Sequence, residues 1–236
     1  MERILSHHTQ NPNNSPYTPE GIVLSAGRAL WGSAFAQLRA LSVDVSADSF
    51  RVYFISDGLL NEDQEEECHC IGTEILADFP DAVEGFEEIF VCSPEPESIL
   101  APGTLVYMRR ERHPQNEAIA RGARIKEVLQ GASVNRPNLL FAVNQALLGE
   151  VTPSLRRVVA DWSRSPTTIL FYYDGPVTDL EKSIGGRVAA VIKTWLPELQ
   201  VQPVVERLDY PERPPTSPDR GAARGLVYMR WEPTPE

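Results

Sequence analysis

The residues best suited by type to metal or thiol chemistry are Cys68, His69 and Cys70, which follow one another in the chain. Thiolate ligands of one metal ion are usually separated by two to four residues, and positions i and i+2 of a helix face different ways. We therefore expect Cys68 to be a small core residue and not a ligand. His113 has no counterpart in the other half of the chain, so a catalytic thiolate is not supported. No metal and no cofactor is expected.

Two other patterns resemble catalytic or phosphate-binding motifs. Asp57-Gly58 recurs as Asp174-Gly175, but aspartate before glycine at the end of a strand is first of all turn chemistry. Gly185-Gly186 lies in a helical pattern and lacks the spacing and the lysine of a phosphate-binding loop, so close helix packing explains it better. No arrangement of acidic residues predicts two carboxylates in one apolar cleft, as general acid–base catalysis requires. We therefore assign no catalytic residue.

An internal repeat organises the elements around these residues. The pentapeptide Leu105–Arg109 occurs again as Leu226–Arg230, an offset of 121. Before the pentapeptide, identical residues of the two copies are 117 positions apart, and no gap is needed to align them. Because the offset rises from 117 to 121, four extra residues are expected in the loop before the second pentapeptide. Alternation would place Leu105, Tyr107 and Arg109 on one face of a closing strand. The first-copy positions that match at 117 are Ala29, Leu30, Gly32, Leu38, Arg39, Asp44, Phe54, Asp57, Gly58, Ile75 and Pro80.

The elements of the first copy follow from capping and periodicity. Thr18-Pro19-Glu20 starts a helix that ends near Gly32, because a hydroxyl cap precedes a proline at the first helical position. Residues 41–45 and 50–54 alternate as a hairpin with one buried face. A capping box starts a second helix, 61–78, with a stripe of Ile71, Ile75 and Phe79. Strands over 86–92 and 104–110 complete the copy.

The second copy repeats this order. Thr178 and Glu181 form its capping box, and Ile169, Phe171 and Tyr173 alternate on its second strand. Its predicted buried stripe is Leu180, Ile184, Val188, Ile192 and Trp195. The chain is therefore predicted to be α+β, a tandem duplication of an α-β-β-α-β-β module. Each module is expected to hold a four-stranded, mainly antiparallel sheet packed by helices.

Four segments are predicted along the chain. Residues 1–17 form a flexible N-terminal arm, in which His7-His8 is a solvated pair; residues 18–112 form the first module. Residues 113–135 form a helical connector, with its helical pattern over 117–130, and residues 136–236 form the second module.

Composition limits the partners. The net charge of -11 disfavours a general phosphate-backbone binder and favours a basic protein partner. No apolar run reaches the roughly 18 residues of a membrane span, and residues 1–16 hold no apolar signal core, so we expect a cytoplasmic protein. The chain has three cysteines, Cys68, Cys70 and Cys92, and all three are expected to be reduced thiols.

Two regions are candidates for binding a protein partner. The acids that open the helix at 61–78 interact favourably with its dipole, and they also form an anionic surface for a basic partner. The aromatic residues and the proline-rich loop over 208–224 of the second copy suit recognition, although they are equally explained as an ordinary surface connection. The predicted partner-binding residues are Glu62, Asp63, Glu65, Glu66, Tyr172, Asp174, Asp209 and Tyr210.

The second copy also resembles a protein family. The segments that carry the likeness are 146–153 (ALLGEVTP), 171–175 (FYYDG), 207–211 (RLDYP) and 226–230 (LVYMR). They are similar to small bacterial immunity proteins of polymorphic toxin and colicin-like systems, closely over about 145–232 and loosely in the first copy. The resemblance implies a cytoplasmic, non-enzymatic inhibitor that binds a cognate toxin and occludes its active site. It implies no catalytic residues.

Two alternatives belong to other classes of protein. One is a scaffold or regulatory binding module, which predicts partners but no inhibition. The other is an enzyme whose site lies between the copies, built from residues such as Arg39, Arg156, Asp57 and Asp174. An enzyme predicts a concave pocket with strongly perturbed titrating groups, so a structure separates it from an inhibitor.

Overall fold

The computed structural model of the protein describes residues 18–45, 50–80, 85–111, 134–163, 165–212, 223–230 and 232. The predicted arm over 1–17 lies outside these residues, as do residues 113–133 of the connector predicted over 113–135 and residues 213–222 of the predicted binding loop. No described helix is long and apolar enough to cross a membrane.

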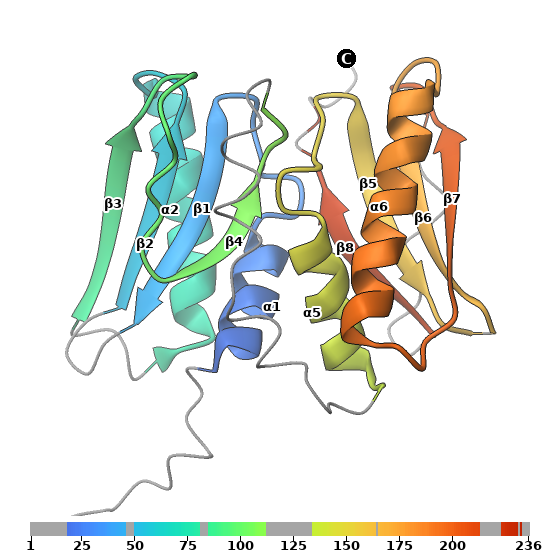
Figure 1. The fold of residues 1–236 in the computed structure, drawn as a ribbon. Helices are drawn as coiled ribbons and strands as arrows, with labels where there is room; N and C mark the ends of the chain where they lie inside the picture. Colours follow the sequence, from blue (N-terminus) through green and yellow to red (C-terminus); the bar gives the residue numbers. More distant parts are fainter. Residues whose placement is uncertain are drawn as a thin grey trace, which may run out of the picture.

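Two copies of an α-β-β-α-β-β unit make up the described chain, which confirms the predicted α+β duplication (Figure 1). The first copy contains α1 (Pro19–Ala29), β1 (Leu38–Val45), β2 (Phe50–Ser56), α2 (Glu62–Ala77), β3 (Phe86–Cys92) and β4 (Thr104–Met108). The second contains α5 (Arg136–Ala146), β5 (Leu155–Asp161), β6 (Thr167–Tyr173), α6 (Asp179–Trp195), β7 (Val201–Arg207) and β8 (Arg224–Met229).

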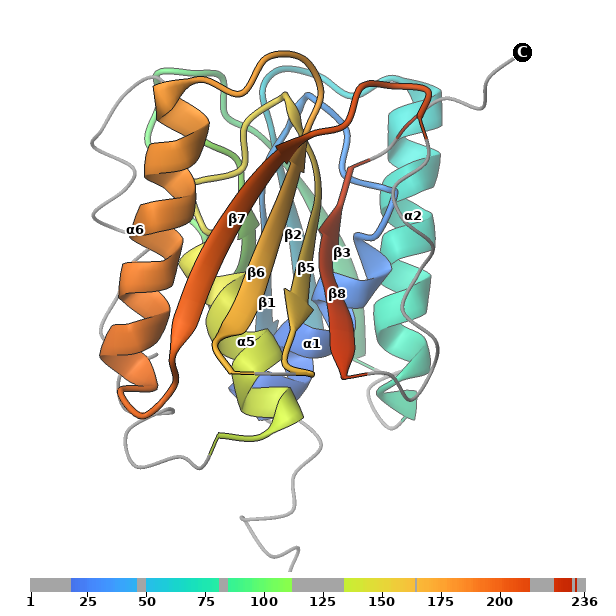
Figure 2. The ribbon, with the colours of Figure 1, turned by 90° about the vertical axis from the view of Figure 1, so that its right-hand side faces the viewer.

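Each copy forms one four-stranded mixed sheet. The strand orders are β3-β2-β1-β4 and β7-β6-β5-β8, and the only parallel pairs within them are β2 with β3 and β6 with β7. A parallel pair needs a crossover connection, which α2 and α6 supply. The sheets lie side by side with β4 and β8 at their inner edges (Figure 1), and α2 and α6 flank them on opposite sides (Figure 2).

The predicted helix starts are confirmed. The Asn61 side chain accepts a hydrogen bond from the Gln64 N–H at 2.9 Å, and the Gln64 side chain accepts one from the Asn61 N–H at 3.1 Å. The same reciprocal box opens α6 at Thr178. These boxes satisfy backbone N–H groups that have no partner inside the helix.

The buried stripes of α2 and α6 largely match the prediction. Ile71 and Ile75 of α2 and Ile184 and Val188 of α6 are fully buried. Leu180 is the exception, because it is 44% exposed at the start of α6, where the first turn faces a groove instead of the sheet. The prediction that Leu180 belongs to the core is therefore wrong.

Cys68 and Gly185 have the packing roles expected of them. All three cysteines are free thiols, and burial raises the pKa of Cys68 to about 12, so this thiol stays protonated at neutral pH. An added Cβ at Gly185 would lie 3.0 Å from Val205, which confirms close helix packing there. Gly186 faces open space, so close packing does not explain that glycine.

The repeated pentapeptide departs from simple alternation. The pairing of β1 with β4 shifts between Leu41 and Ser42, which face Tyr107 and Leu105, so β4 bulges at Val106. Val106 and Tyr107 consequently both enter the main core, whereas Leu105 turns to the other face of the sheet. The predicted alternation of the motif is wrong for this reason, and β8 carries the same irregularity.

The loop lengths also need a correction. β3 and β7 correspond at an offset of 115, from Phe86 and Val201, and the pentapeptides correspond at 121. The second copy is therefore two residues shorter before its third strand and six residues longer, not four, after it.

The two copies interlock across an approximate two-fold relation. The Gly149 N–H donates to the Met108 carbonyl at 2.9 Å, and the Gly32 N–H donates to the Met229 carbonyl at 2.9 Å. Both bonds run from the turn after the first helix of one copy to the last strand of the other. Each such turn thus continues the inner edge of the opposite sheet.

Apolar side chains cross between the copies in the same way. Leu148 packs on the first sheet, and Trp31 packs on the second. The hairpin prediction of one buried face is therefore wrong for β1, whose first six residues are all buried. On the other face of each sheet, which the helices of its own copy cover, a single hydrophobic core runs through both copies.

We expect Gly149→Ala to destabilise the fold by about 1–3 kcal/mol, because Gly149 has φ +74° and an added Cβ would lie 2.9 Å from the Met108 methyl. Gly186→Ala is the matched control. It sits exposed in α6 with open space around it, so it should stabilise by about 0.5–1 kcal/mol. Urea unfolding measures both, and equal stability of the two variants would contradict the proposed role of Gly149.

Candidate functional site

A groove between the two copies is the candidate site. Its borders are the C-terminal ends of β4 and β8, the turns after α1 and α5, and the first turns of α2 and α6. Tyr107 and Tyr228, the central residues of the repeated pentapeptides, lie in it as a stacked pair with ring centroids 6.5 Å apart and planes 8° from parallel. The approximate two-fold axis that relates the copies therefore passes through the groove, between these two tyrosines.

A buried arginine supports the first-copy side of this groove. The Arg39 guanidinium is fully buried, forms a bidentate pair with the Glu111 carboxylate, and donates to the carbonyls of Ser93 and Glu97. A guanidinium has five donors in a planar fork, and these partners use several of them. Arg39 consequently ties the end of β4 to the loop after β3.

A second arginine, Arg109, lies at the groove surface. It donates to Asp57 at 2.7 Å and to the Ala36 carbonyl at 2.7 Å, and lies 3.6 Å from Glu95. The other Asp57 oxygen accepts the Glu95 N–H at 2.9 Å. Asp57 therefore ends the strand, as predicted, and also holds the neighbouring loop and Arg109 in place.

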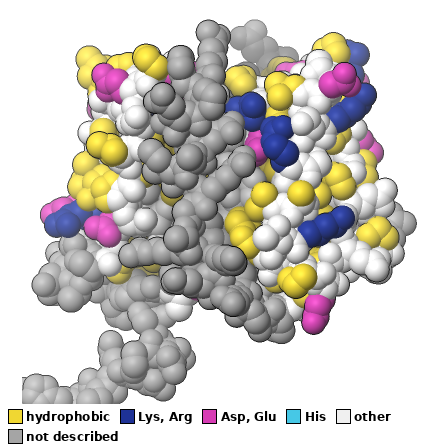
Figure 3. Space-filling model, viewed as in Figure 1, with side chains coloured by type: hydrophobic (Ala, Val, Ile, Leu, Met, Phe, Trp, Pro, Cys, Tyr) yellow, Lys and Arg dark blue, Asp and Glu magenta, His cyan; other side chains and the backbone are white. Residues whose placement is uncertain are grey.

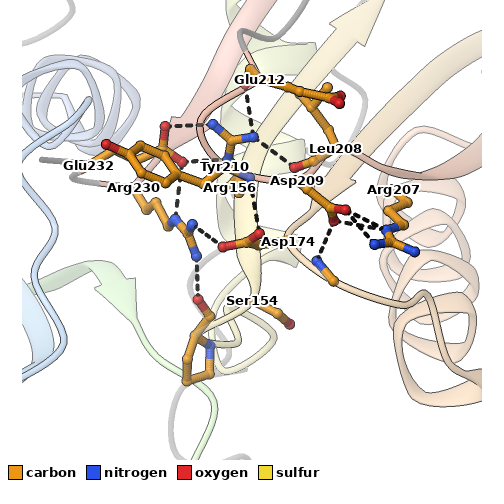
Figure 4. Close-up of polar contacts among 12 residues, drawn as sticks. Ser154, Arg156, Asp174, Arg207, Leu208, Asp209, Tyr210, Glu212, Arg230 and Glu232 are labelled. Carbon is orange, nitrogen blue, oxygen red and sulfur yellow. Dashed lines mark hydrogen bonds and ion pairs between the residues drawn. The ribbon is translucent and has the colours of Figure 1, made fainter. Parts of the chain in front are cut away.

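The second copy repeats both arrangements (Figure 4). Arg156 pairs with Glu232 at 2.7 Å and donates to the Leu208 carbonyl at 2.7 Å. Arg230 donates to Asp174 at 2.7 Å, and Asp174 accepts the Tyr210 N–H at 3.1 Å. Two equivalent networks of arginine and carboxylate thus frame the groove.

These networks explain the charge state of the repeated aspartates. The hydrogen bond from Arg109 is the main cause that lowers the pKa of Asp57, and Arg230 has the same effect on the pKa of Asp174. Both carboxylates therefore remain ionised near neutral pH and are poorly suited to donate protons. Arg39 and Arg156, which the enzyme alternative placed in a site, lie behind the groove with their donors engaged.

The two walls of the groove have different chemistry. Asp63 on α2 corresponds to Leu180 on α6, each two positions after the N-cap residue of its helix. Glu95 corresponds to Tyr210, since each precedes a cis-proline and donates its N–H to the repeated aspartate. All four residues line the groove, so at these two positions the first-copy wall carries carboxylates where the second-copy wall carries a leucine and a tyrosine.

Negative charge predominates in the groove. Among the described residues, eight carboxylates and three guanidinium groups line it, whereas charges of both signs are scattered over the described residues of the face in Figure 3. Asp63 and Glu67 make no hydrogen bond or ion pair with another described residue. The lining carboxylates are Asp57, Asp63, Glu67, Glu95, Glu111, Asp174, Glu181 and Glu232.

The structure separates the predicted partner-binding residues into three groups. Asp63, Asp174 and Tyr210 line the groove. Glu62, Glu65 and Glu66 are exposed on α2 away from it, and Asp209 caps the Gly175 N–H at 2.9 Å while pairing with Arg207. Tyr172 is only 7% exposed and packs on the second sheet with Val159 and Leu226, so we leave it out of the surface proposed below.

Sequence reasoning named Asp57 and Asp174 but missed the two tyrosines, the surface arginines and the glutamates Glu111 and Glu232. Their signal was present, because Arg109 and Arg230 end the repeated pentapeptide, and each is followed two residues later by a glutamate, Glu111 or Glu232. The repeat therefore extends beyond the pentapeptide to an arginine and a glutamate two residues apart. A strand does not require this pair of charges, so the pair indicates a further role.

A single family model matches the chain twice, over residues 19–111 and 136–232, and its description is MafI2 immunity protein. The chain belongs to the MafI2 immunity protein family. Both copies are members, including the first, whose likeness to immunity proteins was loose by sequence. Membership implies that the chain neutralises a cognate MafB toxin. A comparison with curated proteins gave no match.

The lowered pKa values predict a loss of stability in acid. A carboxylate with a lowered folded-state pKa stabilises the fold above its ordinary pKa, near 4, and loses this effect as pH falls through the folded value. Asp174→Asn should cost about 1 kcal/mol at pH 7, because the side chain is 35% exposed and partly screened.

The difference between this variant and the wild type should shrink below about pH 4. Urea unfolding at several pH values measures it, with the exposed substitution Glu66→Gln as the control. A difference that stays constant down to pH 2 would disprove the assigned ion pair.

Proposed function

We propose that the chain neutralises its toxin by binding a positively charged surface of it in the groove between the copies, thereby covering the toxin's active site. The observation that carries the proposal is the excess of carboxylates over guanidinium groups among the described residues that line this groove. Complementary charge speeds encounter and selects the partner, and a toxin that acts on an anionic substrate offers such a surface.

Preformed geometry supports the proposal. The lining carboxylates of the repeated networks are already held by arginines, so little side-chain ordering accompanies binding. Asp63 and Glu67 add negative charge that no described residue neutralises. The groove therefore combines a rigid frame with free charge on one wall.

The proposal includes no catalytic step. The repeated aspartates pair with arginines, and the Cys68 thiol is buried and protonated, so both are poorly placed for proton transfer or nucleophilic attack. The inhibitor acts by contact alone, in the cytoplasm. Because the two copies together form the groove, one chain binds one toxin molecule there. The toxin domain that it contacts is basic.

The first test is co-expression with the product of the neighbouring toxin gene. A stable one-to-one complex and loss of toxin activity are expected. If the toxin stays fully active with excess protein present, inhibition by this chain is ruled out. Co-purification without inhibition would instead favour a scaffold.

Charge reversal on one helix then locates the surface. The double variant Asp63→Lys/Glu67→Lys should weaken toxin binding by about 10-fold or more, and binding should weaken with added salt. Glu65→Lys/Glu66→Lys changes the same charge on the same helix outside the groove and should have a much smaller effect.

Isothermal titration calorimetry with catalytically inactive toxin provides both dissociation constants. Equal losses in the two variants would assign binding to the whole acidic start of α2. No loss in either variant would show that the groove is not the toxin-binding site.

A further inference from the structure

The tyrosine pair in the groove has unused hydrogen-bonding capacity. Tyr107 and Tyr228 are 7% and 8% exposed, and neither hydroxyl has a hydrogen-bond partner among the described residues. Neither hydroxyl oxygen belongs to the fully enclosed, unpartnered atoms, in contrast to that of Tyr173. Both residues line the groove, so both hydroxyls reach its open space.

A hydroxyl that opens onto a groove and has no partner in the described protein is satisfied by water, and a ligand that enters the groove must replace that hydrogen bond. Burial raises the pKa of Tyr107 and of Tyr228, so both are neutral phenols whose oxygens accept hydrogen bonds. The nearby carboxylates favour a positively charged donor over a neutral one. An arginine guanidinium offers several donors and stays charged at any physiological pH.

We propose that the groove receives one arginine side chain of the toxin, whose guanidinium donates hydrogen bonds to the hydroxyls of Tyr107 and Tyr228. This inference rests on the proposed function and names the residue type that the same groove recognises. The arginine enters along the approximate two-fold relation between the copies. Toxin residues beside it meet the two different walls.

The unequal walls determine the orientation of the toxin segment. Asp63, Glu67 and Glu95 on the first-copy wall favour further positive charge. Leu180, 44% exposed, and Tyr210 on the second-copy wall favour an apolar neighbour of the inserted arginine. A segment bound the other way round would place apolar atoms on carboxylates and a charge on leucine, which costs desolvation without a partner.

The first test needs no toxin. Nα-acetyl-arginine amide should shift the NMR signals of ¹³C-labelled Tyr107 and Tyr228 rings in a saturable manner. Nα-acetyl-citrulline amide, which has nearly the same shape without the charge, should bind at least about 10-fold more weakly. Equal shifts from both compounds, or no shift from the arginine compound at tens of millimolar, would overturn the inference.

The second test uses the complex with inactive toxin. Tyr107→Phe/Tyr228→Phe keeps both rings and should weaken binding by about 10-fold or more, because hydrogen bonds to a charged group are lost. Tyr173→Phe is the matched control: it also removes an unpartnered hydroxyl, but from a side chain that is fully buried and does not line the groove. It should bind like the wild type.

The results also separate this inference from the proposed function. If Asp63→Lys/Glu67→Lys loses binding and the tyrosine variant does not, the groove binds toxin but the hydroxyls do not receive its arginine. If neither variant loses binding, both ideas are wrong. A loss in the tyrosine variant that Tyr173→Phe shares would reflect the fold and would also count against the inserted arginine.

Discussion

The backbone exchange between the copies is the constraint on which the rest of the structure depends. Gly149 and Gly32 each donate a hydrogen bond to the last strand of the other copy, and Leu148 and Trp31 each cover the other copy's sheet. An edge strand otherwise presents unpaired backbone groups, so this pairing protects both inner edges. The groove, its tyrosine pair and both arginine networks lie where the two exchanges meet.

Buried arginines then turn this junction into a rigid frame. Arg39 and Arg156 each join the end of one copy's last strand to the loop after its third strand, through a carboxylate and backbone carbonyls. Removing either partner would leave a buried charge uncompensated, which typically costs several kcal/mol. Both copies retain the frame, whereas the groove walls differ at Asp63 and Leu180, so the shared parts set geometry and the divergent parts set chemistry.

Local signals predicted the elements well because their physics is local. Capping boxes at Asn61 and Thr178 involve residues three positions apart, and the duplication was visible as identical letters at a constant offset. The bulge at Val106 exists only in the pairing of β4 with the distant strand β1, and the exposure of Leu180 depends on the groove between the copies. No short sequence pattern contains either of these contacts. Asp57 was assigned to turn chemistry, since its second role needs Arg109 from 52 residues away.

Covalent fusion of the copies has a consequence for how the inhibitor can change. In a symmetric dimer built on this interface, one codon change would alter both walls at once, so every gain on one side would be copied to the other. Here the position of Asp63 is encoded separately from that of Leu180. Each wall can therefore acquire substitutions that match changes in the toxin surface without altering the other wall. The backbone exchange between the copies meanwhile maintains the fold.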